Sequence, residues 1–199
     1  AQALPNPHAL DELRARMQEI LGRPSASEPR KPGVPAPSPA SDRERLANLP
    51  LMEAENAAGR FWLRRKCLRV TERVGRFDLR SAENADAERL SLLSLDASLG
   101  PLDLSRALYL DTETTGLGGG AGTYAFLIGL GFFEDGQLTV EQIFLAGPEQ
   151  EPAALTHLRG RINQAEVLVS YNGKSFDWPL LKGRYVMSRL SRLEDKPHL

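Results

Sequence analysis

The sequence predicts an α/β fold with a mixed β-sheet, preceded by a separate helix and a proline-rich linker. Between residues 105 and 199, strand and helix patterns follow one another in the order β-β-β-α-β-α, with tight-turn signals between them. Six prolines fall within residues 24–39 and separate the N-terminal segment from the rest of the chain. The 199 residues are 41% hydrophobic, which is enough for one sizeable core.

Two segments precede the predicted core. Residues 1–22 carry Leu10, Leu13 and Met17 at helical spacing, which predicts a short amphipathic helix. Residues 23–42 are rich in Pro, Ser and Ala, and we expect them to form a disordered or extended linker.

Residues 43–104 form a basic region whose fold the sequence leaves uncertain. Residues 43–59 have a weakly helical pattern. Residues 61–71 look like a strand that turns back at Gly75, and the leucines of residues 86–99 indicate one more helix.

Positive charge gathers in this basic region. Residues 60–80 hold eight basic residues against two acids, whereas residues 101–199 hold nine basic residues against 12 acids. A basic strip beside an acidic module fits a polyanionic partner, although charge alone fits a plain solvated face slightly better. Phe61 and Trp62 could stack on bases, but such aromatics more often pack on a neighbouring domain. Cys67 is expected to be a small buried hydrophobe.

The predicted sheet begins near residue 105, and turn residues mark its connections. Asp135-Gly136 is a strong hairpin signal, and Asn172-Gly173 turns the chain before the last helix. The fourth strand is expected to run beside the first. The expected elements are strands at 106–112, 124–133 and 138–145, a helix at 151–164, a strand at 167–170 and a helix at 179–190.

Asp111 and Glu113 stand one residue apart at the end of the first of these strands. Side chains alternate along a strand, so both carboxylates are expected on the same face. Two neighbouring carboxylates repel each other unless a cation or protons neutralise them, and hard oxygen ligands suit Mg²⁺ or Mn²⁺. The plain alternative is a strand that ends in a solvated polar turn.

Asp177 opens the last predicted helix, where an acidic residue is also an ordinary helix cap. If the fourth strand lies beside the first, however, this helix begins near Asp111 and Glu113. Three acids from two loops would then be able to hold two metal ions about 4 Å apart, which activate water for phosphodiester cleavage.

These motifs are similar to those of a known family. Asp111-Thr-Glu113 followed by Thr-Thr-Gly-Leu resembles the first motif of the DEDD 3′–5′ exonucleases, and Tyr171-Asn-Gly-Lys-Ser-Phe-Asp177 resembles their second motif. With the segment Gly119-Gly-Ala-Gly-Thr-Tyr-Ala-Phe126 between them, residues 105–199 resemble the bacterial YprB-type ribonuclease H-like family.

The resemblance implies a ribonuclease H-like three-layer α/β fold for residues 105–199, with elements after the β-β-β-α-β-α series missing. It implies a Mg²⁺ or Mn²⁺ site and a nucleic-acid substrate, either DNA or RNA. The implied metal ligands and catalytic residues are Asp111, Glu113 and Asp177. The implied nucleic-acid-binding residues are Thr114, Gly116, Leu117, Asn172 and Phe176.

One part of the family's pattern is not found. DEDD enzymes use a fourth acid, with a Tyr or His a few residues before it, and Asp195 lies in a polar loop without either at residues 190–192. The chain is therefore expected to be a C-terminally incomplete domain with impaired activity. His198 is given no catalytic role, and His8 and His157 are expected at the surface.

Several other functions are disfavoured. A single cysteine excludes an internal disulfide framework, and no apolar run approaches the ~18 residues of a membrane span, which favours a cytoplasmic protein without a membrane partner. No Gly-Lys-Ser/Thr follows the glycine-rich loop, and no zinc-ligand spacing occurs. The sequence thus predicts a metal-dependent nuclease, with a non-catalytic nucleic-acid-binding module as the alternative.

Overall fold

The computed structural model of the chain describes residues 49–116 and 122–199. The predicted N-terminal helix (1–22), the proline-rich linker (23–42) and Leu117 lie outside the described residues. In the described part of the chain, no helix is long and apolar enough to cross a membrane.

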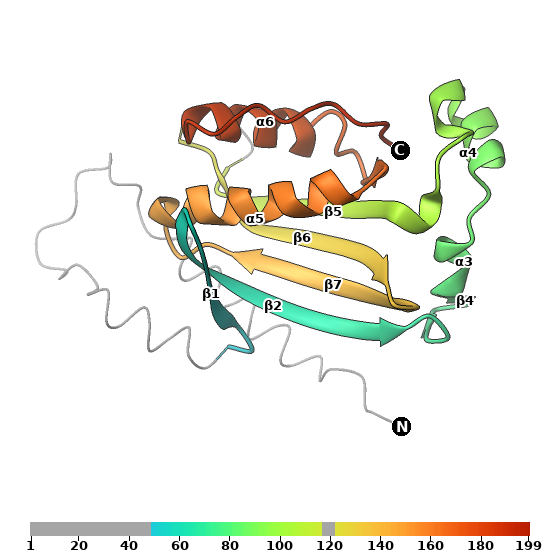
Figure 1. Ribbon diagram of the computed structural model, residues 1–199, viewed down its shortest axis with the longest axis horizontal. Coiled ribbons are helices and arrows are strands. Elements are labelled where there is room, and N and C mark those ends of the chain that lie inside the picture. Colours follow the sequence, from blue (N-terminus) through green and yellow to red (C-terminus); the bar gives the residue numbers. More distant parts are fainter. Residues whose placement is uncertain (1–48, 117–121) are drawn as a thin grey trace, which may run out of the picture. The chain divides into compact units, whose positions relative to one another are not determined.

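A six-stranded mixed sheet is the central element (Figure 1). Its strand order is β1-β2-β7-β6-β5-β8, in which only β5 and β8 are parallel neighbours. The strands are β1 (Met52–Asn56), β2 (Gly59–Arg69), β5 (Ala107–Thr114), β6 (Ala125–Glu134), β7 (Gln137–Phe144) and β8 (Val167–Val169).

The order β-β-β-α-β-α predicted from residue 105 onward is confirmed by β5, β6, β7, α5 (Glu151–Gln164), β8 and α6 (Asp177–Met187). Asp135 and Gly136 join β6 to β7 with φ angles of 52° and 67°, as a tight hairpin requires. We expected this last helix to start at Pro179, but α6 begins two residues earlier, at Asp177.

The expectation of a weak helix at residues 43–59 is wrong for its described part, because residues 52–56 form β1. This strand pairs antiparallel with β2, and the side-chain amide of Asn56 donates to the carbonyl oxygen of Ala153 at 2.8 Å. The expected strand at 61–71 is confirmed as β2, which pairs with β7. Both strands precede residue 105, where we expected the sheet to begin, yet they extend that sheet beside β7.

Short elements connect β2 to β5. The predicted turn at Gly75 joins β3 (Arg73–Val74) to β4 (Phe77–Asp78). The single helix expected at 86–99 is instead divided, because Leu95 adopts a left-handed φ of 55° and ends the first part. The remaining short elements are α3 (Arg80–Glu83), α4 (Ala87–Ser94), and 3₁₀ turns at Ala97–Leu99, Leu104–Arg106 and Pro148–Gln150.

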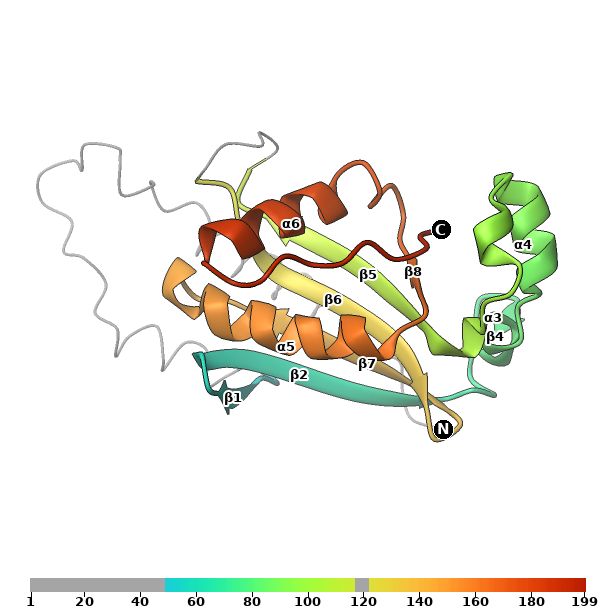
Figure 2. The same cartoon turned by 45° about the horizontal axis from the view of Figure 1, so that its top comes forward.

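Helices α5 and α6 lie side by side over one face of the sheet (Figures 1 and 2). The hydroxyl of Tyr185 on α6 donates to the carbonyl oxygen of Leu155 on α5 at 2.6 Å. The largest core cluster fills the space beneath both helices, and burial of each large apolar side chain contributes about 1.5–3 kcal/mol. Its fully buried members include Leu108, Ile128, Ile143, Leu155, Leu158, Leu168 and Leu181.

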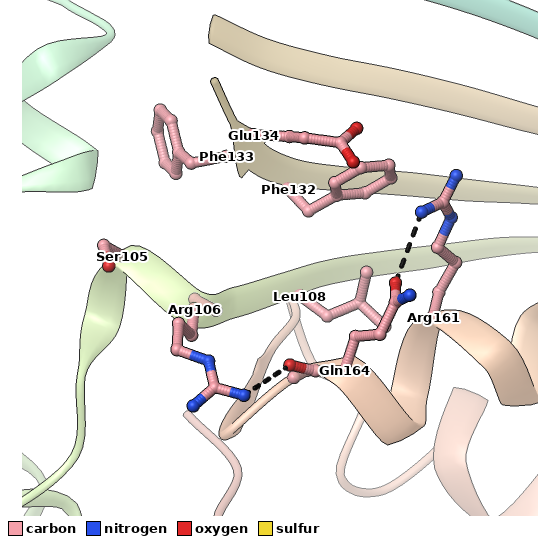
Figure 3. Close-up of a pocket in the computed structure, with 10 residues that line it drawn as sticks. Ser105, Arg106, Leu108, Phe132, Phe133, Glu134, Arg161 and Gln164 are labelled. Carbon is pink, nitrogen blue, oxygen red and sulfur yellow. Dashed lines mark hydrogen bonds between the residues drawn. The ribbon is translucent and has the colours of Figure 1, made fainter. Parts of the chain in front are cut away.

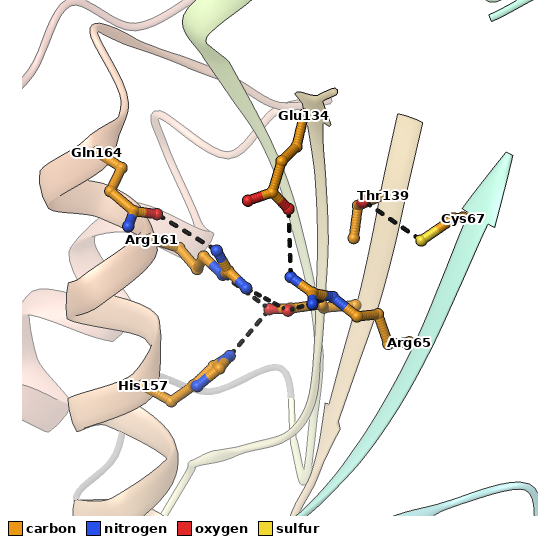
Figure 4. A network of polar contacts seen from close by, with 8 residues as sticks. Arg65, Cys67, Glu134, Thr139, His157, Arg161 and Gln164 are labelled. Atoms are coloured by element: carbon orange, nitrogen blue, oxygen red, sulfur yellow. Dashed lines mark hydrogen bonds and ion pairs between the residues drawn. The ribbon is translucent and has the colours of Figure 1, made fainter. Parts of the chain in front are cut away.

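The buried carboxylate of Glu141 on β7 links β7 to the neighbouring strand β2 and to helix α5. His157 lies 2.9 Å from its Oε2 atom, and Arg161 donates to both carboxylate oxygens. Arg65 on β2 lies 3.2 Å from Oε1, so three side chains converge on this group (Figure 4). His157 was expected at the surface, but it is half-buried between this carboxylate and the ring of Phe61.

Two further expectations concern β2. Phe61 is 2% exposed and its ring lies 5.2 Å from that of His157, so it packs in the core and cannot stack on a base. Cys67 was expected to be buried, but it is exposed, with its sulfur 3.6 Å from the hydroxyl of Thr139.

Candidate functional site

Asp111 and Glu113 occupy the face of β5 opposite to the helices. Leu108 and Leu110 on the same strand are buried in the core beneath α5 and α6, and alternation puts both acids on the other, open face. Both acids are exposed. Within residues 49–116 and 122–199, neither carboxylate has an ion-pair or hydrogen-bond partner. Two unneutralised carboxylates therefore project from one strand.

A groove of about 500 Å³ runs over the open face beside Asp111. Glycines 129 and 131 of β6 form its floor, because they place no side chain there. The walls come from four strands and include Tyr109, Phe133, Leu138, Val140, Gln142 and Val169. The groove gives Asp111 an apolar neighbourhood on one side and solvent on the other.

Asp177 is the first residue of α6 and only 4% of its surface is exposed. Its Oδ1 atom accepts a hydrogen bond from the hydroxyl of Thr112, which lies between the two β5 acids in sequence but on the helix-covered face. Asp177 does not cap its own helix, because Phe176 is the cap residue and no side chain caps the helix start. The third acid thus reaches β5, at the residue between the other two.

The structure does not bring the three acids into one cluster. No group of three or more His, Cys, Asp or Glu side chains in the described part of the chain is placed to hold a metal ion. The oxygen donors of Asp111 and Glu113 fit Mg²⁺ or Mn²⁺ by their chemistry and by their lack of partners. Asp177 does not complete that ligand set while its carboxylate is bonded to Thr112.

The motif residues after β8 shape a tight loop. Asn172 has a left-handed φ of 60°, and its carbonyl oxygen accepts from the backbone N–H of Ser175. Gly173 is buried, and a Cβ atom there would lie 2.3 Å from the Ser170 hydroxyl and 3.1 Å from Oδ2 of Asp177. A side chain at Gly173 would therefore clash with Ser170 and press against the Asp177 carboxylate. Phe176 is half-buried, so its ring contributes to packing.

The remaining motif residues follow β5. The hydroxyl of Thr114 donates to the carbonyl oxygen of Gly116 at 2.9 Å, which holds the chain as it leaves the strand. A regular register is lost between Glu113 and Thr114, where β5 and β6 form an irregular pairing. Such irregularities re-aim side chains next to functional sites. Thr114 and Gly116 remain candidate contacts for a nucleotide.

Two contacts near Asp177 could not be anticipated from the motifs. Nε2 of His198, which is 6% exposed, lies 2.6 Å from the Ser170 hydroxyl. Burial and the nearby Lys174 lower the pKa of His198, against the opposite influence of Asp177. Asp195 accepts hydrogen bonds from Lys182 and Trp178, and these lower the pKa of Asp195. Both contacts join residues distant in sequence, so no local pattern predicts them.

A second cavity, of about 160 Å³, lies at the other end of β5 (Figure 3). Leu108 and Phe132 line it together with Arg161, whose guanidinium stacks on the Phe132 ring at 4.3 Å. Its charged groups are already engaged, since Arg106 pairs with Glu166 and Arg161 with Glu141. Because this cavity lies at the start of β5, it is separate from the candidate site at Asp111 and Glu113.

The mixed sheet, with the acidic pair on β5, fits a ribonuclease H-like fold. Residues 108–199 match the family RNase_H_2 of the RNase_H superfamily. Over 92 residues the chain is 41% identical to the uncharacterized protein YprB of Bacillus subtilis (strain 168). The matched segment covers 45% of this chain and 22% of YprB. Residues 108–199 are thus similar to a YprB-type ribonuclease H-like domain, and the predicted α/β fold class is confirmed.

Removing the Thr112 hydroxyl is expected to lower the free energy of unfolding by about 1.5–3 kcal/mol, because the buried Asp177 carboxylate loses its hydrogen bond. Thr112→Val keeps the shape of the side chain, and urea denaturation measures the loss. Thr114→Val is the matched control, since its hydroxyl donates only to a backbone carbonyl, and a smaller loss of about 0.5–1.5 kcal/mol is expected. Equal losses of unfolding free energy in the two variants would show that the hydrogen bond from Thr112 to the buried carboxylate is no stronger than the one from Thr114 to a backbone carbonyl.

Proposed function

We propose that this domain is a metal-dependent nuclease that hydrolyses phosphodiester bonds in nucleic acid, as a 3′–5′ exonuclease. The observation that carries the proposal is the pair Asp111 and Glu113, exposed on one face of β5 and without a cation partner in the described residues. Its support is the ribonuclease H-like domain around them. Because the chain spans 22% of YprB, the activity proposed concerns this domain.

The proposed ligands of Mg²⁺ or Mn²⁺ are Asp111 and Glu113, and Asp177 would join them as the third once its carboxylate leaves the hydrogen bond with Thr112. A bound divalent ion would supply an activated water and would stabilise charge on the phosphate. The two β5 carboxylates would hold the cation, while the Thr112 hydroxyl donates to Asp177. Thr114, Gly116, Leu117, Asn172 and Phe176 are proposed to position the nucleotide.

Hydrolysis of 5′-labelled oligonucleotides, with Mg²⁺ or Mn²⁺ and with a chelator, tests the proposal. Asp111→Asn is expected to lower the metal-dependent rate at least about 100-fold, since it removes a ligand charge. Shortening from the 3′ end would establish the direction of attack. Binding of Mn²⁺ to the protein, measured by calorimetry, provides a readout that does not depend on turnover.

Asp135→Asn is the matched control for that experiment. It makes the same chemical change in the hairpin between β6 and β7, and asparagine tolerates the φ of 52° at this position. The control is expected to keep the wild-type rate. Hydrolysis by Asp111→Asn at the rate of Asp135→Asn would refute the assigned site.

A further inference from the structure

The segment that follows α6 runs back along that helix to the loop that precedes it (Figures 1 and 2). There it pairs with β8 in the parallel sense. The backbone N–H of Leu168 donates to the carbonyl oxygen of Pro197 at 2.9 Å. The backbone N–H of Ser170 donates to the carbonyl oxygen of Leu199 at 3.1 Å. This pairing places His198 beside the loop of residues 170–176, which leads from β8 into α6.

His198 contacts the chain at both ends of this loop. At its start, Nε2 of His198 lies 2.6 Å from the hydroxyl oxygen of Ser170. Beyond its other end, in the first turn of α6, the ring of Trp178 meets the His198 ring edge to face with centroids 6.2 Å apart. His198 and Trp178 are each 6% exposed. One buried side chain therefore supports the loop on both sides.

Both contacts lead to the carboxylate of Asp177. A Cβ atom at Gly173 would lie 2.3 Å from the Ser170 hydroxyl and 3.1 Å from Oδ2 of Asp177, so the Gly173 backbone lies against both groups. The carbonyl oxygen of Gly173 also accepts from the backbone N–H of Trp178 at 2.8 Å. The position of Asp177 therefore depends on where Ser170 and Trp178 are held.

Asp177 has a second support, which is of a different kind. The Thr112 hydroxyl donates to the carboxylate itself, so this bond must break before Asp177 can join Asp111 and Glu113 around a metal ion. The contacts of His198 are made with other residues of the loop and of α6, so they do not compete with a metal ion. His198 is thus the support that remains when the carboxylate leaves Thr112.

We propose that His198 is a positioning residue for Asp177, because it holds the loop from which the third proposed metal ligand projects. This inference rests on the proposed function and adds a residue outside its acidic set. His198 acts through Ser170 and Trp178 and takes no part in the chemistry at the phosphate.

Urea denaturation of the protein in the presence of a chelator tests the positioning without metal. Thr112→Val is expected to raise the unfolding equilibrium constant of the otherwise unchanged protein about 10- to 150-fold. In the His198→Phe background, the same change is expected to raise the constant at least about 5-fold less, because the loop no longer holds Asp177 against Thr112. Phenylalanine keeps a ring beside Trp178 but cannot bond with Ser170.

Two further variants examine the hydrogen bond. His198→Gln can still bond with the Ser170 hydroxyl, so Thr112→Val is expected to keep its full effect in that background, within about 2-fold. Ser170→Ala removes the same hydrogen bond from its other partner and is expected to reduce the effect of Thr112→Val as His198→Phe does. Circular dichroism establishes that each variant is folded before denaturation.

His157→Phe is the matched control, because it makes the same change at a half-buried histidine that contacts Glu141 and Phe61. It is expected to lower stability and yet to leave the full effect of Thr112→Val. A full effect of Thr112→Val in both the His198→Phe and Ser170→Ala backgrounds would overturn the proposal. An equal reduction in the His157→Phe background would also overturn it, since the reduction would then follow from any loss of stability.

Calorimetric titration with Mn²⁺ connects the positioning with the proposed function. His198→Phe is expected to weaken Mn²⁺ binding about 10-fold, as is usual when a residue that orients a metal ligand is replaced. In the Asp177→Asn background, the same change is expected to weaken binding less than about 2-fold, because His198 acts only through Asp177. Equal weakening in the two backgrounds would overturn the proposal.

The proposed function and the role of His198 fail in different ways. A protein that binds no Mn²⁺ would refute the metal site, while the coupling between His198 and Thr112, measured without metal, would still decide the positioning. Conversely, hydrolysis that needs Asp111, together with unchanged Mn²⁺ binding by His198→Phe, would leave the nuclease standing and refute the role of His198.

Discussion

Replacing Arg184 by methionine is expected to lower the free energy of unfolding by about 3–5 kcal/mol, because it leaves a buried carboxylate unpaired. Nε and Nη2 of Arg184 on α6 donate to the two oxygens of Glu151 on α5 at 2.7 and 2.6 Å. Glu151 is 5% exposed. The hydrogen bond with Glu151 raises the pKa of Arg184, against the opposite effect of burial.

A double variant separates the effect of the unpaired charge from the effect of the packing around it. Glu151→Met/Arg184→Met removes both charges, so it is expected to be more stable than Arg184→Met alone. Arg192→Met changes an exposed arginine and is expected to stay within about 0.5 kcal/mol of wild type. Chemical denaturation gives all four values, and a loss in Arg184→Met no larger than in Arg192→Met would contradict a structural ion pair.

The elements from residue 105 onward could be predicted because their signals are local. Alternating apolar residues, Asp135-Gly136 and the helical spacing at 151–164 each determine a conformation within a few residues. The shared face of Asp111 and Glu113 follows from the same period of two. Local pattern thus defines the β5 acids and the strand that carries them.

Contacts between residues far apart in sequence could not be predicted from local sequence patterns. Met52–Asn56 reads as a weak helix because Met, Glu and Ala favour helices, yet pairing with β2 makes it a strand. The bond between Thr112 and Asp177 joins residues 65 positions apart, so the sequence could bring Asp177 near β5 but could not choose its partner. The pairing of β2 with β7 likewise joins residues far apart in sequence, and nothing in residues 60–80 indicates it.

The Glu141 network joins β2 to β7, because Arg65 on β2 pairs with Glu141 on β7. Burial alone would raise the pKa of the Glu141 carboxyl. Hydrogen bonds from His157 and Arg161, with the positive charge of these groups, outweigh burial and lower the pKa from 4.5 to about 2. The charged form is therefore the one that the folded protein stabilises.

Acidification is expected to remove this contribution. A carboxyl with a lowered pKa in the folded state contributes stability that is complete above pH 4.5 and is lost as the pH falls toward 2. A shift of this size corresponds to about 3 kcal/mol. His198, whose pKa is lowered mainly by burial, adds a loss that begins below pH 6.5. Asp195, whose pKa is also lowered, adds a loss in the acid range, so the contribution of Glu141 is obtained by comparison with a variant.

Glu141→Gln tests the assignment, because glutamine keeps the shape and hydrogen-bonding capacity of the side chain without its charge. The variant is expected to be about 3 kcal/mol less stable than wild type at pH 7 and close to wild type near pH 2. Urea denaturation at half-unit steps of pH measures both curves. If the free energies of unfolding of the two proteins fell in parallel between pH 4.5 and 2, the charge of Glu141 would not contribute to stability.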